Sequence, residues 1–257
     1  MFGRKRLAAF AASALLLGIG TLGAEAGASV STQGVSPPKK KPIQPGAPVC
    51  TAGGPLDDGA CSEYSTLNFV FRGNHRLYIG AVAHNFAGAG DRAMIRGETR
   101  HFGRVVVDDD SVDFLHPGDA PDPNGSDFAL IRIRRGRHGD VQPSVRTFGG
   151  PTGYTTAVET ETADAINAYG QGRPDLSNPT GPRSGQLVAD SHRAFSSTVS
   201  ESGGDSGMPY VHAETGKALG VNANCMCGFE PGLYPTVEYI LERLDALGFR
   251  LKLVRGG

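Results

Sequence analysis

The sequence predicts an all-β fold that closes with a single C-terminal α-helix. From about Cys61 onward, short β-rich runs alternate with Gly, Pro, Asn and Asp, a pattern typical of short strands joined by turns. The chain has 37 Gly and 17 Pro among its 257 residues, which favours turns over long helices. The spacing of the runs suits a β-barrel or a β-sandwich. The runs are LNFVF, RLYIGAVA, GRVVVD, DFALIRIR and ALGVNA.

The first 26 residues have the three parts of a secretory signal peptide. A basic stretch at residues 4–6 precedes an apolar run, and Ala24-Glu25-Ala26 then matches an A-x-A cleavage pattern. The alternative is a membrane anchor, but the run is short and rich in small residues, and no stop-transfer charges follow it. We therefore expect residues 1–26 to be removed and the mature protein to be secreted and extracellular, without membrane attachment.

Residues 27–60 are predicted to be a linker or a pro-segment. They are rich in Pro, Gly and Ser, and most of the stretch has no apolar period. The formal net charge of the chain is −1, no basic block is long enough to indicate nucleic-acid binding, and the run Lys39-Lys40-Lys41 is isolated in this Pro-rich stretch. A nucleic-acid partner is therefore not expected.

The predicted helix covers about residues 236–247. The spacing of its apolar residues follows one helix face. Thr236 is a candidate N-cap, and Gly248 can end the helix. We expect this helix to pack on the β-structure and close the fold. The apolar residues are Val237, Ile240, Leu241, Leu244 and Leu247.

Four cysteines suit an exported protein, and they allow three pairings. They are Cys50, Cys61, Cys225 and Cys227. A Cys50–Cys61 bond would close a small Gly-rich loop, whereas a bond between Cys225 and Cys227 would be strained. No histidine stands at ligand spacing beside the last two, and the acidic run at residues 108–113 lacks the spacing of a calcium loop. No metal or other cofactor is expected.

The segment SGGDSGMP, residues 202–209, has the composition of a catalytic turn. The hydroxyl of Ser206 needs a base and an oxyanion site to act as a nucleophile. Glycines on either side allow a tight backbone path that turns N–H groups inward. The predicted oxyanion donors are the N–H groups of Gly204 and Ser206.

Two further residues could complete such a site. His84 follows the β-rich run LYIGAVA, where a strand ends, and it is the candidate base. Asp127 follows a turn and opens the apolar strand FALIRI, and it is the candidate carboxylate that orients the imidazole. Other acidic residues lie nearby, but only Asp127 directly precedes a strand that the sequence predicts to be buried. The other acids are Asp113, Asp119 and Asp122.

These three motifs together resemble the chymotrypsin-like serine proteases, and secreted bacterial members most of all. AVAH (81–84), DFALI (127–131) and GDSGMP (204–209) occur in the family's order, and the resemblance runs from about residue 61 to 250. It implies a peptidase domain over 61–257 made of two perpendicular six-stranded β-barrels, about 61–138 and 145–235. The active site would lie between the barrels. The resemblance also implies that Asp205 is a buried carboxylate whose ion pair steadies the oxyanion loop.

The same resemblance assigns a specificity pocket. The residue six before the nucleophile, Ser200, would form its floor, and Ala223 and Asn224 would belong to its walls. A neutral floor predicts an apolar or small substrate side chain, although the adjacent Glu201 would reverse this if the loop register shifts. Asn85 stands where secreted members carry a cysteine, which leaves Cys61 without its usual partner.

The predicted function is therefore that of a secreted serine endopeptidase with protein or peptide substrates, acting as a monomer. Two alternatives share the same residues. One is a binding protein on this scaffold without turnover, and the other is an esterase that uses the same triad. An α/β-hydrolase is disfavoured because its triad runs in the order Ser, acid, His, and only His212 follows Ser206.

Overall fold

A computed structural model of the chain describes residues 40–51, 64–109, 126–157, 159–172, 179–223 and 234–257. All of them belong to one compact unit, Lys39–Gly257. They form two antiparallel β-sheets and one α-helix, which confirms the predicted all-β class with a C-terminal helix. The predicted signal peptide and most of the predicted linker lie outside the described residues.

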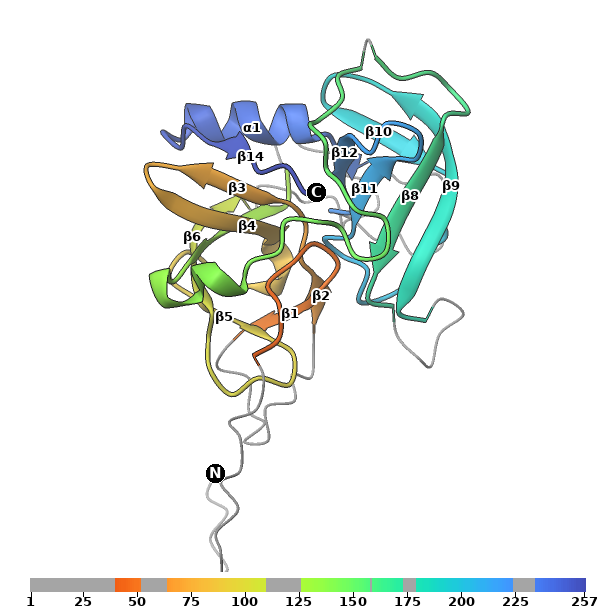
Figure 1. Ribbon diagram of the computed structural model, residues 1–257. Helices are drawn as coiled ribbons and strands as arrows, with labels where there is room; N and C mark the ends of the chain where they lie inside the picture. Colours follow the sequence, from red (N-terminus) through yellow and green to blue (C-terminus); the bar gives the residue numbers. More distant parts are fainter. Residues whose placement is uncertain (1–39, 52–63, 110–125, 158, 173–178, 224–233) are drawn as a thin grey trace, which may run out of the picture. The chain divides into compact units, whose positions relative to one another are not determined.

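The first sheet contains eight strands in the order β14-β3-β4-β7-β6-β5-β1-β2 (Figure 1). Two of these strands, β2 and β14, have only two residues each. The bounds are β1 Pro48–Thr51, β2 Ser65–Thr66, β3 Val70–Gly73, β4 Arg76–Val82, β5 Arg92–Ile95, β6 Gly103–Asp109, β7 Phe128–Ile133 and β14 Lys252–Leu253.

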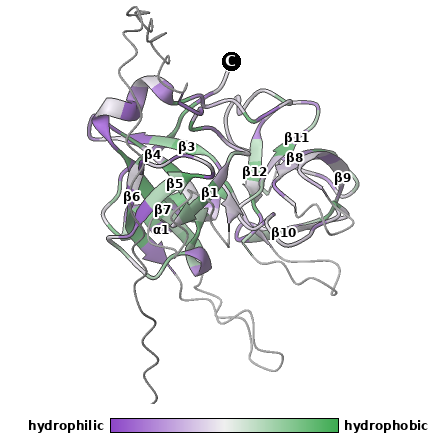
Figure 2. Ribbon diagram, turned by 90° about the horizontal axis from the view of Figure 1, so that it is seen from below, coloured by the Kyte–Doolittle hydropathy of each residue, from purple (hydrophilic) through white to green (hydrophobic). Residues whose placement is uncertain are grey.

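Strands β4 and β7 form the centre of this sheet and place the first half of the candidate site. Both are buried along most of their length, as expected for near-continuous apolar runs, and Figure 2 shows the hydrophobic character of β4. They are antiparallel, and Val82 at the end of β4 faces Phe128 at the start of β7. The residues that follow β4 and precede β7 therefore meet at one edge of the sheet.

The first sheet curves back toward β4. The Asn68 N–H donates to the Gly80 carbonyl at 2.9 Å, and the Gly80 N–H donates to the Phe69 carbonyl at 3.0 Å. The chain just after β2 is thereby bonded to β4, although β2 stands at the far end of the strand order. This return gives the sheet its barrel-like curvature.

The second sheet contains six strands in the order β12-β11-β8-β9-β10-β13. A bridge between Gly220, in β12, and Thr236, just after β13, joins its two ends. The two sheets thus form a half-barrel and a nearly closed barrel, the chymotrypsin-like arrangement. The bounds are β8 Ala165–Gly170, β9 Gly181–Asp190, β10 Ala194–Ser197, β11 Pro209–His212, β12 Ala218–Val221 and β13 Tyr234–Pro235.

Helix α1, Val237–Ala246, packs into a hydrophobic cluster that both sheets share. Val237, Ile240 and Leu244 contribute from the helix. The cluster also includes Phe71 and Leu130 from the first sheet and Val211 and Val221 from the second. Each sheet has a further core of its own. One shared core therefore connects the helix to both sheets.

The predicted start of the helix is confirmed, but one of its residues is placed differently. Thr236 is the N-cap, and its Oγ1 accepts a hydrogen bond from the Tyr239 N–H at 3.1 Å. Leu247, which the apolar spacing assigned to the packed face, is half-exposed. The helix ends at Ala246, and Leu247 takes a non-helical cap conformation, so the helical spacing no longer applies to it.

The predicted linker at residues 27–60 is wrong over residues 43–51, and residues 52–60 lie outside the described part of the chain. Strand β1 lies inside it and pairs with both β2 and β5. Ile43 and Val49 are fully buried in the first core. The described part of this stretch is therefore part of the folded domain, because β1 completes the first sheet between β5 and β2.

Two short 3₁₀ helices complete the described elements. Helix η1, Ala83–Asn85, follows β4 directly, and η2, Arg135–Asp140, follows β7. Within the described residues, no helix is both long enough and apolar enough to cross a membrane.

Candidate active site

His84 and Asp127 meet at the edge of the first sheet where β4 ends and β7 begins. The Nδ1 atom of His84 lies 2.7 Å from Oδ2 of Asp127, and the His84 backbone N–H donates to Oδ1 of the same carboxylate at 2.9 Å. The imidazole is about one-third exposed, whereas the carboxylate is buried. A buried carboxylate on Nδ1 fixes the ring's orientation and its tautomer and leaves Nε2 for chemistry.

The backbone at Asp127 adopts a conformation that is uncommon for a residue with a side chain. Its φ is +42°, in the left-handed region, where most non-glycine residues are strained. The Asp127 carbonyl accepts a hydrogen bond from the Ala83 N–H at 3.1 Å. Main-chain and side-chain bonds thus both hold Asp127 against the segment that carries His84.

The turn that carries Ser206 is attached to the first sheet at Thr66. The Thr66 N–H donates to the Ser206 carbonyl at 2.7 Å, and the Thr66 hydroxyl donates to the Gly204 carbonyl at 2.9 Å. Gly207 passes so close that an added Cβ would lie 2.1 Å from the Thr66 carbonyl and 3.6 Å from the backbone nitrogen of Val82. Val82 is two residues before His84, so the turn lies beside the end of β4.

Two glycines give this turn its path. Gly204 has a φ of +93° and Gly207 a φ of +87°, both in the region that favours glycine. Ser206 is buried between them, with 8% of its surface exposed. Within the described part of the chain, no acceptor takes the N–H of Gly204 or of Ser206. Such N–H groups can stabilise an oxyanion.

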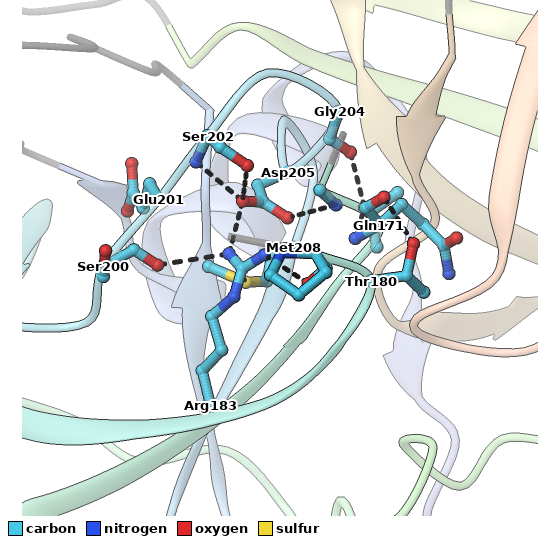
Figure 3. Close-up of polar contacts among 12 residues, drawn as sticks. Gln171, Thr180, Arg183, Ser200, Glu201, Ser202, Gly204, Asp205 and Met208 are labelled. Carbon is cyan, nitrogen blue, oxygen red and sulfur yellow. Dashed lines mark hydrogen bonds and ion pairs between the residues drawn. The ribbon is translucent and has the colours of Figure 1, made fainter. Parts of the chain in front are cut away.

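Asp205 lies at the centre of a buried polar cluster beneath the turn (Figure 3). The carboxylate is fully buried and forms an ion pair with Arg183, a residue of β9. It also accepts hydrogen bonds from the N–H groups of Gly172 and Ser202, each at 2.8 Å. A buried carboxylate needs such partners, and together they fix the conformation of residues 202–206.

Sequence reasoning predicted an ion pair at Asp205 but not its partner. Arg183 stands in the polar strand GPRSGQLVAD, which gives no local signal that its side chain would be buried. Its guanidinium also donates to the Ser200 carbonyl at 3.1 Å and the Pro179 carbonyl at 3.2 Å. Thr66 was likewise missed as the anchor of the turn, because it contacts Gly204 and Ser206 only in the folded chain.

The structure describes two of the three residues that the sequence predicted to line a specificity pocket. Ser200 is exposed, and its carbonyl faces Arg183. Ala223 is buried, and Asn224 lies outside the described residues. The neighbour of Ser200, Glu201, places its carboxyl against the Tyr210 hydroxyl, which donates to it at 2.5 Å. The side chain of Glu201, not that of Ser200, is therefore the one directed into the second sheet's core.

The remaining predictions about cysteines and metals lie largely outside the described residues. Cys50 is buried in β1, whereas Cys61, Cys225 and Cys227 are not described. Among the residues that are described, no cluster of three His, Cys, Asp or Glu side chains could hold a metal ion. Of the acidic run that could have held calcium, Asp109 instead pairs with Arg243 at 2.9 Å.

Comparison with solved structures identifies the fold. Protease A of Thermobifida fusca superposes with a TM-score of 0.50 and 21% identity, over 83% of this chain and 99% of that one. A glutamic-acid-specific serine protease that uses a histidine triad in substrate binding superposes with a TM-score of 0.53 and 15% identity, over 82% of this chain and 100% of that one. No protein-family model matches the chain, and no curated protein matches it in sequence. The chain therefore has the fold of the chymotrypsin-like serine proteases.

Proposed function

We propose that this chain is a serine endopeptidase in which Ser206 is the nucleophile, His84 the general base and Asp127 the residue that orients the imidazole. One observation carries the proposal. A histidine–carboxylate pair stands at the ends of two neighbouring strands, beside a glycine turn that holds a buried serine. A serine hydroxyl becomes an effective nucleophile only with such a base at hand.

The proposed reaction follows from these positions. The Ser206 Oγ attacks the substrate carbonyl carbon while its proton passes to Nε2 of His84, and the N–H groups of Gly204 and Ser206 stabilise the oxyanion. The carbon–nitrogen bond then breaks as His84 returns the proton to the leaving amine. A water molecule, deprotonated by the same imidazole, hydrolyses the acyl-enzyme and regenerates the Ser206 hydroxyl. Asp127 stays ionised throughout and stabilises the imidazolium.

Labelling with a serine-directed fluorophosphonate tests the proposal directly. The native chain should become covalently labelled at Ser206, and Ser206→Ala should abolish both the label and peptide cleavage. Ser191→Ala is the matched control, because it removes an exposed hydroxyl in the turn between β9 and β10. Asp127→Asn should reduce kcat by about 10⁴-fold, because it misorients the imidazole. A native chain that neither labels nor cleaves would favour the binding-protein alternative.

Two companion proposals complete the assignment. Matched amide and ester substrates distinguish an endopeptidase from an esterase, since only the endopeptidase cleaves the amide efficiently.

Export is proposed from the N-terminal 26 residues and predicts a mature N-terminus at Gly27 in protein recovered from the medium. We also propose that the protein is a monomer, and its mass in solution, measured by light scattering, tests this.

A further inference from the structure

Asp109 connects the segment that carries Asp127 to helix α1. The Ser126 hydroxyl donates to Oδ2 of Asp109 at 2.6 Å. Arg243, on α1, binds the same carboxylate with two nitrogens: its Nη2 lies 2.9 Å from Oδ1, and its Nε lies 3.3 Å from Oδ2. Ser126 is buried, and the Asp109 side chain is largely buried as well. A carboxylate removed from water needs such partners, so the three side chains form one connected unit.

The strand register places this unit at the start of β7. Asp109, the last residue of β6, stands opposite Phe128, the first residue of β7. Side chains of directly opposed residues share one face of a sheet. Phe128 belongs to the hydrophobic cluster that includes α1, so Asp109 lies on the face that the helix covers. The hydrogen bond from Ser126 therefore reaches Asp109 from the residue directly before Asp127.

Asp127 is held on both sides in a backbone conformation that costs free energy. Its φ of +42° is in the left-handed region, and a non-glycine residue stays there only where its surroundings fix it. On the C-terminal side, the pairing of Phe128 with Val82 holds the chain against β4. On the N-terminal side, the hydrogen bond from Ser126 to Asp109 holds it. The direction of the Asp127 carboxylate therefore depends on both contacts.

We propose that Asp109 is a positioning residue, which holds Ser126 and thereby keeps Asp127 in the conformation that directs its carboxylate at His84. Arg243 fixes the Asp109 carboxylate from the helix, and such a two-nitrogen contact also fixes its orientation. Asp109 acts through its neighbours and not on the substrate. The effect on catalysis rests on the proposed function, whereas the alignment of Asp127 with His84 can be measured in a chain without activity.

A second ion pair provides a matched control for a purely stabilising role. Arg137 also binds a carboxylate with two nitrogens: its Nη1 lies 2.8 Å from Oε2 of Glu98, and its Nη2 lies 3.2 Å from Oε1. The Glu98 side chain is 12% exposed, against 10% for Asp109. Arg137 belongs to η2, which follows the other end of β7. Removing either carboxylate should lower stability, but only the Asp109 contact should affect His84.

Titration of His84, followed by NMR in a Ser206→Ala chain, tests the alignment without requiring turnover. Ser126→Ala removes the hydrogen bond to Asp109 and changes no charge. A nearby carboxylate favours the imidazolium, so its displacement should lower the pKa of His84 by about half a unit or more. Glu98→Gln should leave this titration unchanged. An unchanged titration of His84 in a folded Ser126→Ala chain overturns the proposal.

Peptide cleavage tests the effect on the reaction. Ser126→Ala and Asp109→Leu should each lower kcat by about 10²-fold and change KM little, because a displacement of about 1 Å is enough for such a loss. Asp109→Asn keeps an oxygen that can accept from Ser126, so it should retain more activity than Asp109→Leu. The double variant should lose no more than either single variant, because both changes break the same contact.

Two kinetic results would overturn the proposal. One is an additive loss in the double variant, which would mean that Ser126 and Asp109 act independently. The other is an equal loss of kcat in Glu98→Gln, which would mean that any lost ion pair has this effect. If the native chain neither labels nor cleaves any peptide, the proposed function fails, and the titration of His84 still decides whether the Asp109 contact aligns Asp127.

Discussion

Gly207 leaves no space for a side chain in the turn that holds Ser206. Its φ is +87°, and an added Cβ would lie 2.1 Å from the Thr66 carbonyl, a main-chain atom that cannot easily move away. Gly248, after helix α1, has nearly the same φ of +85°, but nothing lies within 4 Å of its added Cβ. Substitutions at the two glycines therefore distinguish the free-energy cost of a positive φ from that of a steric clash.

We predict that Gly248→Ala lowers the free energy of unfolding by about 1 kcal/mol, the cost of a positive φ alone. Gly207→Ala should cost at least about 2 kcal/mol more, because Thr66 and the Ser206 turn must also move apart. Urea denaturation of both variants measures the difference. Equal losses would show that the turn adjusts to a methyl group more readily than the close contact indicates.

Glu201 should also affect stability in a pH-dependent way. Its pKa is raised to about 7 in the folded chain, against a value of 4.5 for an exposed Glu. The folded state therefore binds more protons than the unfolded state between these pH values, and stability falls as the pH rises through about 7. Glu201→Gln should match the native chain near pH 4.5 and be the more stable of the two at pH 8.5. Parallel curves of stability against pH would contradict the raised pKa.

At the scale of the elements, β1 is the strand that completes the first sheet. It lies between β5 and β2, and the chain near it buries Ile43 and Val49 completely. A chain that begins at residue 40 should keep the free energy of unfolding of the full chain. A chain that begins at residue 52 should lose about 5 kcal/mol or more of it, because these buried side chains are missing. Urea denaturation of the two chains tests this.

A control is needed because the shorter chain also lacks Cys50. Cys50→Ser in the chain that begins at residue 40 removes the sulfur but keeps β1 and its pairing. If this variant loses as much stability as the shorter chain does, the stability comes from a bond made by Cys50 and not from the strand.

The sequence contained clear signals for some elements and none for others. Strands β4 and β7 and helix α1 are long enough to show an apolar pattern, and the residues next to the strand ends follow from it. Strand β1 has four residues in a Pro-rich stretch and β14 has two, too few for any period to appear. At the site, His84, Asp127 and Ser206 stand in recognisable local motifs. Arg183 is matched to Asp205 only by long-range folding, and backbone geometry decides that the side chain of Glu201 contacts Tyr210 in the second sheet.

At the scale of the whole molecule, one hydrophobic cluster couples the two sheets. It contains residues of both sheets and three buried residues of α1, among them Ile240. Removing a side chain from this shared core should weaken both sheets together, because neither can keep its inner contacts without the other. A core belonging to one sheet would not have this effect.

We predict that Ile240→Ala lowers the free energy of unfolding by about 2–5 kcal/mol, as is typical for a large buried side chain. Hydrogen exchange followed by mass spectrometry should show faster exchange in β4 and β7 as well as in β11 and β12. Leu247→Ala, which truncates a half-exposed apolar side chain directly after the helix, is the matched control and should change little. Faster exchange confined to one sheet would mean that the two sheets unfold independently.

Strand β14 has a consequence for how the protein is made. Its residues pair with β3, and the Val254 N–H donates to the Val70 carbonyl at 2.8 Å. A ribosome delivers β3 some 180 residues ahead of its partner, so this edge of the first sheet waits unpaired until synthesis has passed residue 254. An exposed strand edge invites pairing with other chains. The nascent polypeptide therefore remains open to wrong partners throughout the synthesis of the residues that separate β3 from β14.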